Sequence, residues 1–243
     1  MKLLTNMILY LAITLFSFLS CTKGNDILPV HEMPADTNTS VYPEQNITWL
    51  ALGDSYTIGH GVAVSERFPK QTTDLLIKNN ITTDKLQYIA TDGWNTFDLQ
   101  AALTRGPLDK SYTIVSLLIG VNDQYQGGDP ENYRVRFTDL LQKSIALAGN
   151  NPSHVFVVSI PDYSVTPFVG TSNKKEVSKA IELFNRINFE ITRDYKCRYT
   201  DVTSISRQSA SSDMIAGDGL HPSGKQYHLW AVDLAKAITA ELK

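Results

Sequence analysis

The sequence predicts an α/β protein, a three-layer α/β/α sandwich built around a five-stranded parallel sheet. Three observations lead to this prediction. Strand-like and helix-like runs alternate from Ile47 onward. Two of the strand-like runs are almost continuously apolar, as expected for parallel strands that are covered on both faces. The helix-like runs each carry a single apolar stripe, which is typical of helices packed on such a sheet.

The five predicted strands are short, and turn residues separate them from the helix-like runs. They are ITWLAL (Ile47–Leu52), LQYIA (Leu86–Ala90), YTIVSLLIG (Tyr112–Gly120), HVFVVSI (His154–Ile160) and CRYTDV (Cys197–Val202). Parallel strands joined by right-handed helical crossovers leave their carboxyl ends at one edge of the sheet. We therefore expect the ligand site at that edge.

Three helices are predicted from their apolar stripes, and we expect all three stripes to belong to the core. Asp129 followed by Pro130 favours a helix start, with a capping side chain before a proline in the first turn. Pro222 is predicted to begin the last helix. The stripes are Tyr133, Phe137, Leu140, Leu141 and Ala148; Val177, Ala180, Ile181, Phe184, Ile187 and Ile191; and Tyr227, Trp230, Ala231, Leu234 and Ile238.

The N-terminus indicates export. Lys2 precedes an apolar run over residues 7–19, which is too short for a permanent membrane span and ends at Ser20-Cys21. We predict a signal peptide over residues 1–20, a lipidated Cys21 that begins a tether over residues 21–45, and a folded domain over residues 46–243. An ordinary signal peptide with an incidental cysteine is the alternative. The protein is expected to cross the inner membrane and to be anchored by lipid in a bacterial cell envelope.

Composition excludes several function classes. The formal net charge of −3 gives no reason to expect a nucleic-acid partner. The two cysteines, Cys21 and Cys197, form no metal-binding cluster, and a lipidated Cys21 leaves no disulfide within the chain. The sequence contains no G-x-S-x-G, H-E-x-x-H, P-loop or complete G-x-G-x-x-G motif. We therefore expect neither a metal nor an organic cofactor.

Ser55, in "GDSY", follows the first predicted strand, where it is either a simple turn or capping residue or a nucleophile. A serine nucleophile needs a base. His221, in "DGLHPSG", lies in a loop before the last helix, and Asp218 three residues earlier can accept the proton on its Nδ1. His60 is a possible pocket residue. The remaining histidines, His31, His154 and His228, fall in the tether, a strand and a helix.

Acyl transfer also requires donors for a developing oxyanion. Asn122 in "GVND" follows the third predicted strand, and Gly93 in "DGWN" follows the second. Both can be ordinary turn residues. If they are not, the Asn122 side chain and the Gly93 N–H are the candidate donors.

These blocks, Ser55 in "GDSY", Gly93 in "DGWN", Asn122 in "GVND" and Asp218 with His221 in "DGLHP", resemble in their order the four blocks of the SGNH hydrolases, the GDSL-like lipases and esterases. The resemblance implies a flavodoxin-like fold. It also implies Ser55 as nucleophile, His221 as base and Asp218 as its orienting partner, with Ser55 N–H, Gly93 N–H and Asn122 as oxyanion donors. Tyr56 replaces the leucine of the name-giving motif.

We therefore expect a secreted, monomeric serine hydrolase that cleaves carboxylic esters as an esterase, a lipase or a carbohydrate deacetylase. An O-acetyltransferase that uses the same site is one alternative. A non-catalytic, glycan-binding surface lipoprotein is the other. The substrate is a small-molecule, polysaccharide or lipid ester. Five aromatic residues near predicted strand ends either line its pocket or pack in loops: Trp94, Phe97, Tyr125, Tyr163 and Phe168.

Overall fold

The computed structural model describes residues 43–243, apart from residues 172, 209, 210 and 212. The predicted signal peptide, Cys21 and residues 22–42 of the predicted tether lie outside the described residues. None of the helices in the described part of the chain is long and apolar enough to cross a membrane.

The sheet has five strands, and every neighbouring pair is parallel, as the sequence predicts. The strand order β2-β1-β3-β4-β5 is the flavodoxin-like order. The strands are β1 (Gln45–Gly53), β2 (Ile81–Ala90), β3 (Ile114–Leu118), β4 (Val155–Val158) and β5 (Arg198–Thr200).

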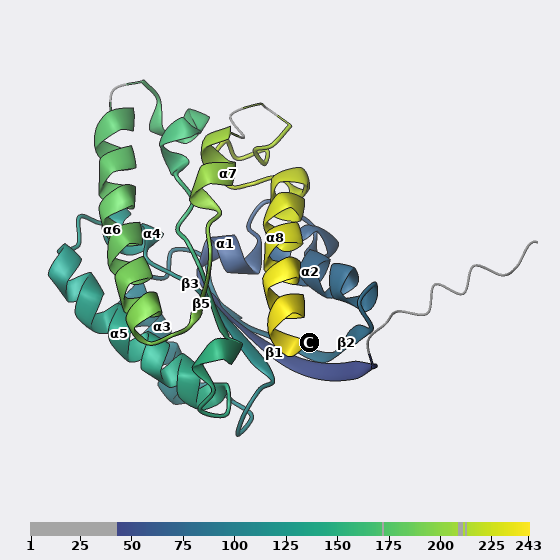
Figure 1. Cartoon of the computed structure of the whole chain (residues 1–243). Coiled ribbons are helices and arrows are strands. Elements are labelled where there is room, and N and C mark those ends of the chain that lie inside the picture. The colour runs from purple at the N-terminus through teal and green to yellow at the C-terminus, as the bar shows by residue number, and fades with distance from the viewer. Residues whose placement is uncertain (1–42, 172, 209–210, 212) are drawn as a thin grey trace, which may run out of the picture. The chain divides into compact units, whose positions relative to one another are not determined.

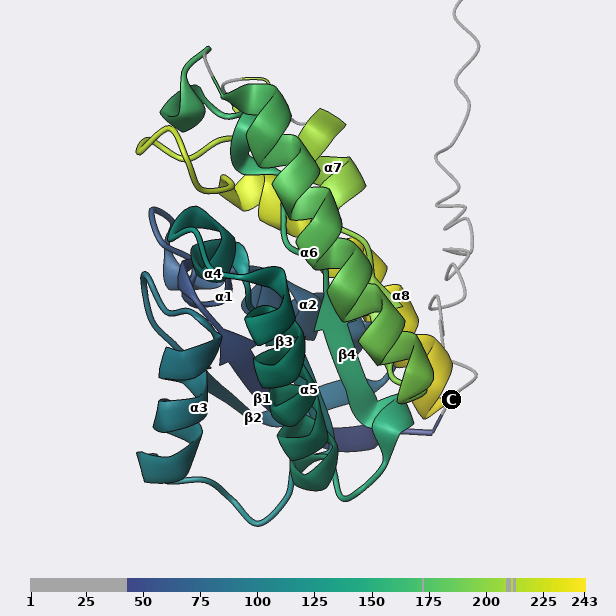
Figure 2. The same ribbon diagram turned by 90° about the vertical axis from the view of Figure 1, so that its left-hand side faces the viewer.

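Helices cover both faces of the sheet, which confirms the predicted three layers. The helices α2 and α8 pack together on one face, and α3, α5 and α6 form the layer on the other face (Figures 1 and 2). The helices are α1 (Ser55–Ile58), α2 (Phe68–Ile77), α3 (Thr96–Arg105), α4 (Val121–Tyr125), α5 (Pro130–Leu147), α6 (Lys174–Asp194), α7 (Thr203–Gln208) and α8 (Gly224–Leu242). Short 3-10 turns η1 to η4 cover Val64–Glu66, Pro152–His154, Tyr163–Val165 and Pro167–Val169.

The predicted stripes are where the core forms. All residues of β3 and β4 are buried, and so are the predicted stripe residues of α8 and of α5 with its C-cap Ala148. In α6, Ile181, Phe184, Ile187 and Ile191 are buried, whereas Val177 and Ala180 are only partly buried. Asp129 caps α5 as predicted, because its side chain accepts a hydrogen bond from the Glu131 N–H.

Several predicted boundaries differ from the structure, and two of the differences have a clear physical reason. β2 begins at Ile81 rather than Leu86. β2 is the edge strand of the sheet and pairs with β1 alone, so its first half can be polar and lacks the apolar run of a central strand. The last helix begins at Gly224 rather than Pro222. Ser223 caps it through the Gln226 N–H, and Pro222 instead pairs with Ile215 in an isolated bridge.

The sheet register aligns the carboxyl ends of β1, β2 and β3, so the loops that follow them begin next to one another. Gly53, the last residue of β1, pairs with Ala90 at the end of β2 and with Leu118 at the end of β3. The segments that follow these three strands therefore start side by side. They contain Ser55, Gly93 and Asn122, and the gap between β1 and β3 is the switch point where sheets of this topology bind ligands.

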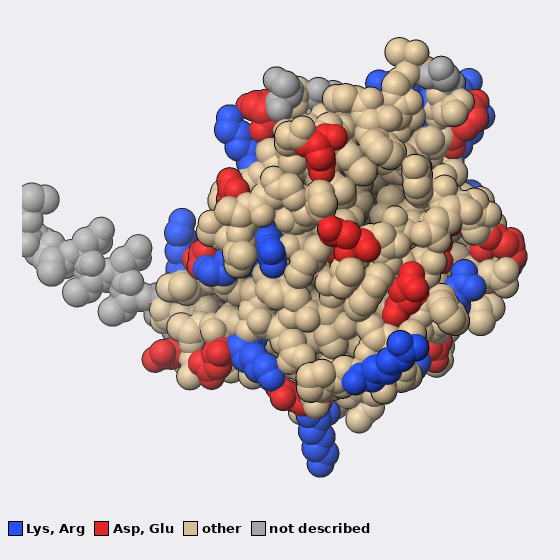
Figure 3. All heavy atoms as spheres, turned by 180° about the vertical axis from the view of Figure 1, so that it is seen from behind, with Lys and Arg blue, Asp and Glu red and all other residues tan. Residues whose placement is uncertain are grey.

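Charged side chains are mixed on the face shown in Figure 3. Lysine and arginine residues are interspersed there with aspartate and glutamate residues, without a large patch of one sign.

Candidate active site

A tight turn at the end of β1 presents Ser55. A Cβ on Gly53 would lie 2.1 Å from Thr57 Oγ1 and 2.5 Å from the Leu118 carbonyl oxygen, so only glycine fits this close approach. Asp54 then caps α1, because its side chain accepts a hydrogen bond from the Tyr56 N–H at 3.0 Å. Ser55 is the first residue of α1, and its own N–H therefore has no acceptor within the helix.

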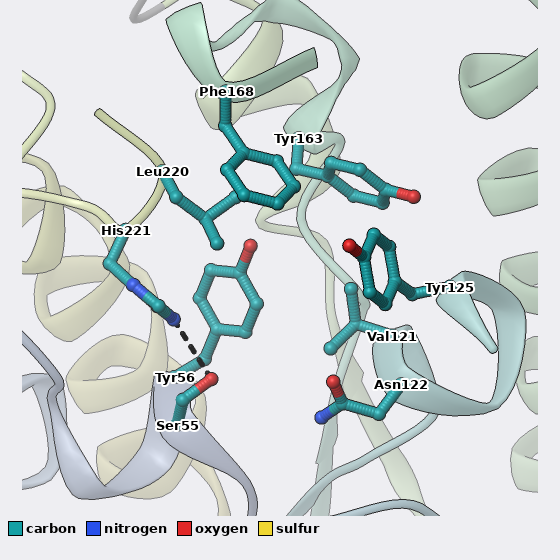
Figure 4. Close-up of a pocket in the computed structure, with 9 residues that line it drawn as sticks. All are labelled: Ser55, Tyr56, Val121, Asn122, Tyr125, Tyr163, Phe168, Leu220 and His221. Carbon is teal, nitrogen blue, oxygen red and sulfur yellow. Dashed lines mark hydrogen bonds between the residues drawn. The ribbon is translucent and has the colours of Figure 1, made fainter. Parts of the chain in front are cut away.

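The structure brings Ser55, His221 and Asp218 together. Ser55 Oγ lies 2.9 Å from His221 Nε2 (Figure 4), and His221 Nδ1 lies 2.6 Å from Asp218 Oδ2. The other carboxylate oxygen of Asp218 accepts hydrogen bonds from the Leu220 and His221 N–H groups at 2.8 and 3.0 Å. Gly219, at φ 73°, lets this short loop fold back on itself.

The surroundings of His221 lower its pKa and keep its imidazole neutral at neutral pH, as a base requires. Burial lowers the pKa of His221 below its usual value of 6.5, and the hydrogen bond and charge of Asp218 partly oppose this effect. Burial tends to raise the pKa of Asp218, but hydrogen bonds from the Leu220 N–H, the His221 N–H and the His221 ring outweigh it, and the net shift is downward. At neutral pH the site therefore holds a neutral imidazole beside an ionised carboxylate.

Asp54, next to the serine, is a different kind of carboxyl group. It is fully buried, and this burial raises its pKa to about 8, with a further contribution from the charge of Asp123. Asp54 is therefore mostly protonated at neutral pH. A charged carboxylate beside Ser55 would oppose a developing oxyanion, and the neutral form avoids that repulsion.

Asn122 lies on α4 and lines the same pocket as Ser55 and His221 (Figure 4). Its side-chain nitrogen donates one hydrogen bond, of 2.8 Å, to the Trp94 carbonyl oxygen. An amide nitrogen carries two hydrogens, so one remains for the pocket. Gly93 lies in the turn between β2 and α3 with φ 78°, and it is not among the residues that line this pocket.

Asp123 holds the two loops that carry these donors, a role that sequence analysis did not identify. Its buried carboxylate accepts hydrogen bonds from Thr96 N at 2.9 Å and Thr96 Oγ1 at 2.5 Å, and it lies 3.4 Å from Arg136 Nη2. The start of α3, the start of α4 and the side of α5 are thereby joined. Its position beside Asn122 in "GVND" was the only signal in the sequence.

A cavity of about 90 Å³ opens beside Ser55 (Figure 4). Three of the five aromatic residues considered from the sequence line it: Tyr125, Tyr163 and Phe168. Their rings pack against one another with centroids 6.0–6.5 Å apart. Trp94 and Phe97 do not line the cavity. The remaining lining residues are Ser55, Tyr56, Val121, Asn122, Leu220 and His221.

His60 is not among the residues that line the cavity. Its Nδ1 is 2.6 Å from Asp92 Oδ2, and its Nε2 is 3.8 Å from Asp218 Oδ2. The sequence pointed to His60 as a possible pocket residue, whereas the structure places it against the carboxylate that supports His221. Nothing in the sequence pointed to Asp92 beyond its place directly before Gly93, in the turn that follows β2.

A model of the GDSL-like Lipase/Acylhydrolase family matches residues 51–229, which is more than half of the chain. The chain belongs to this family. The matched range includes Ser55, Gly93, Asn122, Asp218 and His221. No curated protein matches this GDSL-family chain closely enough to count as a clear relative.

Solved structures resemble this GDSL-family chain in fold. An acetyl xylan esterase from Geobacillus stearothermophilus has a TM-score of 0.63 at 16% identity, covering 80% of this chain and 95% of that one. A psychrotrophic esterase from Pseudoalteromonas sp. has a TM-score of 0.58 at 21% identity, covering 80% and 98%. Phospholipase A1 from Streptomyces albidoflavus has a TM-score of 0.58 at 17% identity, covering 80% and 99%. The SGNH hydrolase fold predicted from the sequence is therefore confirmed.

Proposed function

We propose that this GDSL-family hydrolase is a serine esterase that cleaves esters of short acyl chains. The observation that carries the proposal is a chain of two hydrogen bonds. One joins Ser55 Oγ and His221 Nε2 at 2.9 Å, and the other joins His221 Nδ1 and Asp218 Oδ2 at 2.6 Å. A nucleophile, a base and an orienting carboxylate in this arrangement are what acyl transfer to serine requires.

The reaction proceeds in two stages. Ser55 Oγ attacks the acyl carbon while His221 Nε2 takes the hydroxyl proton and Asp218 stabilises the resulting imidazolium. The oxyanion is bound by the Ser55 N–H and the free amide hydrogen of Asn122. The Gly93 N–H is the third proposed donor, although Gly93 does not line the cavity in this structure. His221 then protonates the leaving alcohol. Water, activated by the same histidine, attacks the acyl-enzyme and releases the acid and Ser55.

The size of the cavity supports a short acyl group. Its volume of about 90 Å³ is well below the roughly 300–1,000 Å³ of pockets that hold drug-sized ligands. An acetyl group or one slightly longer fits beside Ser55, whereas a fatty acyl chain would extend into solvent. Tyr125 and Phe168 are 59% and 49% exposed at the same cavity, and such aromatic surfaces offer a contact for the alcohol part of the substrate.

An acetylated carbohydrate is the favoured natural substrate within this class. Two features support it: the small cavity with exposed aromatic rings, and the likeness in fold to the acetyl xylan esterase. We also propose that the enzyme works outside the inner membrane, anchored through a lipid on Cys21, where polysaccharide esters are accessible.

The test is a series of nitrophenyl esters from acetate to palmitate, set beside acetylated xylan. We expect kcat/KM to be highest for acetate to butyrate and to fall at least about tenfold by octanoate, because forcing extra methylenes into a cavity of about 90 Å³ displaces packed side chains at a cost of about 1–3 kcal/mol. A preference for long chains would contradict the short-acyl proposal. An added sugar acceptor distinguishes hydrolysis from acetyl transfer.

Ser55→Ala tests the nucleophile itself. It should reduce turnover to the background rate and abolish labelling by a fluorophosphonate probe. Ser204→Ala, which changes an exposed serine on α7, is the matched control and should retain both. Labelling that persists in folded Ser55→Ala would place the nucleophile elsewhere.

A further inference from the structure

A second histidine–carboxylate pair lies directly against the Asp218–His221 pair, and the proposed reaction does not use it. His60 and His221 have ring centroids 4.8 Å apart. Asp92 holds His60 through Nδ1 at 2.6 Å, and the other ring nitrogen of His60 lies 3.8 Å from Asp218 Oδ2. Asp218 therefore has an imidazole on each of two sides.

Local backbone geometry holds His60 in this place. It stands between Gly59 and Gly61, which both have positive φ, at 72° and 79°. A Cβ on Gly61 would lie 3.1 Å from Ala216 Cβ and 3.4 Å from Asp218 Oδ2. The turn thus packs closely against the loop that carries Asp218, and the short distance from His60 to Asp218 follows from that packing.

The hydrogen-bond pattern leaves room for a cation between the two pairs. When His60 donates its Nδ1 proton to the Asp92 carboxylate, its Nε2 carries a lone pair. That nitrogen lies 3.8 Å from Oδ2 of the ionised Asp218. Two acceptor atoms at this distance from each other are suited to a shared positive ion.

We propose that His60, Asp218 and His221 bind a divalent transition-metal ion such as Zn²⁺, and that the bound ion inhibits the enzyme. One ligand atom from each residue lies within 4.8 Å of the others. Zinc binds imidazole nitrogen and carboxylate oxygen at about 2.0–2.2 Å, which places two ligand atoms about 3.4 Å apart in a tetrahedral site. The distances of 3.8 Å from His60 Nε2 and 2.6 Å from His221 Nδ1 to Asp218 Oδ2 lie on either side of this value.

Asp92 would not bind the ion itself but would hold the His60 ring in place. A metal-binding histidine commonly donates its other ring N–H to a carboxylate, which fixes the tautomer and the orientation of the ring. His60 already has this contact, with Asp92 Oδ2 2.6 Å from its Nδ1. The fourth position on the ion is open to water because His60 and Asp92 are exposed.

Inhibition follows from the change in the His221 tautomer. In the resting enzyme the His221 proton is on Nδ1, where Asp218 accepts it, and Nε2 is free to take the Ser55 proton. When the ion binds Nδ1, the metal–nitrogen bond replaces the N–H bond, and the neutral ring carries its proton on Nε2. The proton count of His221 is unchanged, but Nε2 can no longer act as a base. His60 loses no proton because the ion binds its free Nε2.

Binding of the ion is tested without using activity. Titration calorimetry with Zn²⁺ is carried out on the full-length chain, purified without a polyhistidine tag, in the wild type and in Ser55→Ala. We expect one ion per chain in both, and visible absorption bands of tetrahedral Co²⁺ when that ion is used instead. His60→Ala and His60→Gln should weaken binding at least about tenfold, and Asp92→Ala about tenfold. His228→Ala is the matched control, because His228 is an exposed histidine of α8 outside the cluster, and it should bind like the wild type.

The inhibitory consequence rests on the proposed esterase function and is measured separately. Zn²⁺ should suppress ester hydrolysis in the wild type and in His228→Ala, with recovery on addition of a chelator. The inhibition constant should rise at least about tenfold in His60→Gln, relative to that variant's own metal-free rate. Absence of stoichiometric binding, or equal binding in folded His60→Ala, overturns the site. Binding without inhibition of an active enzyme overturns the involvement of His221. An enzyme inactive on all esters would refute the proposed function and leave the calorimetric test intact.

Discussion

The two amide hydrogens of Asn122 have different surroundings. One is donated to the Trp94 carbonyl oxygen at 2.8 Å, and this bond holds the side chain in place. The other is available to the pocket that Ser55 and His221 line. If Asn122 is the oxyanion donor that we propose, a side chain held in this way costs no reorganisation during the reaction, and its contribution appears only when the oxyanion forms.

Asn122→Ala should therefore lower kcat by about 10²- to 10³-fold and leave KM nearly unchanged. Steady-state kinetics with a nitrophenyl acetate series measures both. Gln126→Ala is the control, because Gln126 lies at the end of the same helix, bonded to Asn95, outside the pocket lining. A defect in Asn122→Ala that lies mainly in KM would assign this residue to substrate binding.

The pH dependence of the reaction tests His221 and Asp218 together. Because burial lowers the pKa of His221, kcat/KM should rise with pH through an apparent pKa below 6.5. Asp218 opposes this lowering by stabilising the imidazolium. In Asp218→Ala the rising limb should therefore move to still lower pH, while the rate falls by about 10- to 10³-fold because orientation is lost. A limb that moved to higher pH in this variant would contradict the assigned role.

At the scale of elements, Asp123 joins three helices next to the site. Its carboxylate is buried, accepts two hydrogen bonds from Thr96 at the start of α3, and lies near Arg136 on α5. Asn122, which precedes it on α4, points into the pocket. The position of Asn122, the proposed oxyanion donor, therefore depends on a contact that lies outside the cavity.

Asp123→Ala should destabilise the fold by about 3 kcal/mol, because it leaves buried donors and a partly buried guanidinium without their acceptor. It should also lower kcat as α4 loses its attachment to α3. Urea unfolding and steady-state kinetics measure the two effects. Asp129→Ala removes the cap of α5, should cost about 1 kcal/mol, and should leave kcat unchanged. If both variants lost the same stability and neither lost activity, Asp123 would have no role in positioning Asn122.

At the scale of the whole molecule, the sheet order determines where the chemistry can occur. β1 lies between β2 and β3, so the loops after these strands are adjacent although they are separated in the sequence. His221 comes from the other end of the chain, and α8, which follows it, packs on α2. A single core thus holds groups that lie 166 residues apart within 2.9 Å of each other.

Anchoring to the membrane is also a property of the whole molecule, and we predict that it depends on Cys21. Cys21→Ala should move the protein from the membrane fraction to the soluble fraction, because the proposed lipid is then absent. Cys197→Ala is the matched control and should stay with the membrane, since Cys197 lies half-buried within the folded domain. Fractionation with immunoblotting measures both. A wild-type protein that is already soluble would refute the anchor.

The sequence by itself determined the sheet and the core faces of the main helices, and it pointed to the residues of the proposed triad. Apolar periodicity reports which face of an element is buried, and this was enough for β3, β4 and the stripes of α5 and α8. Ser55, Asn122 and His221 could be found because each follows a strand or precedes a helix at the edge where a parallel sheet binds its ligand.

Only the tertiary structure decided how neighbouring loops support one another. The Asp92–His60 pair and the contact of Asp123 with Thr96 join residues 32 and 27 positions apart through polar side chains. Such contacts leave no periodic trace in a sequence, since they depend on loop geometry and not on burial of a face. The start of α8 at Gly224 and the small volume of the cavity were likewise set by packing between elements.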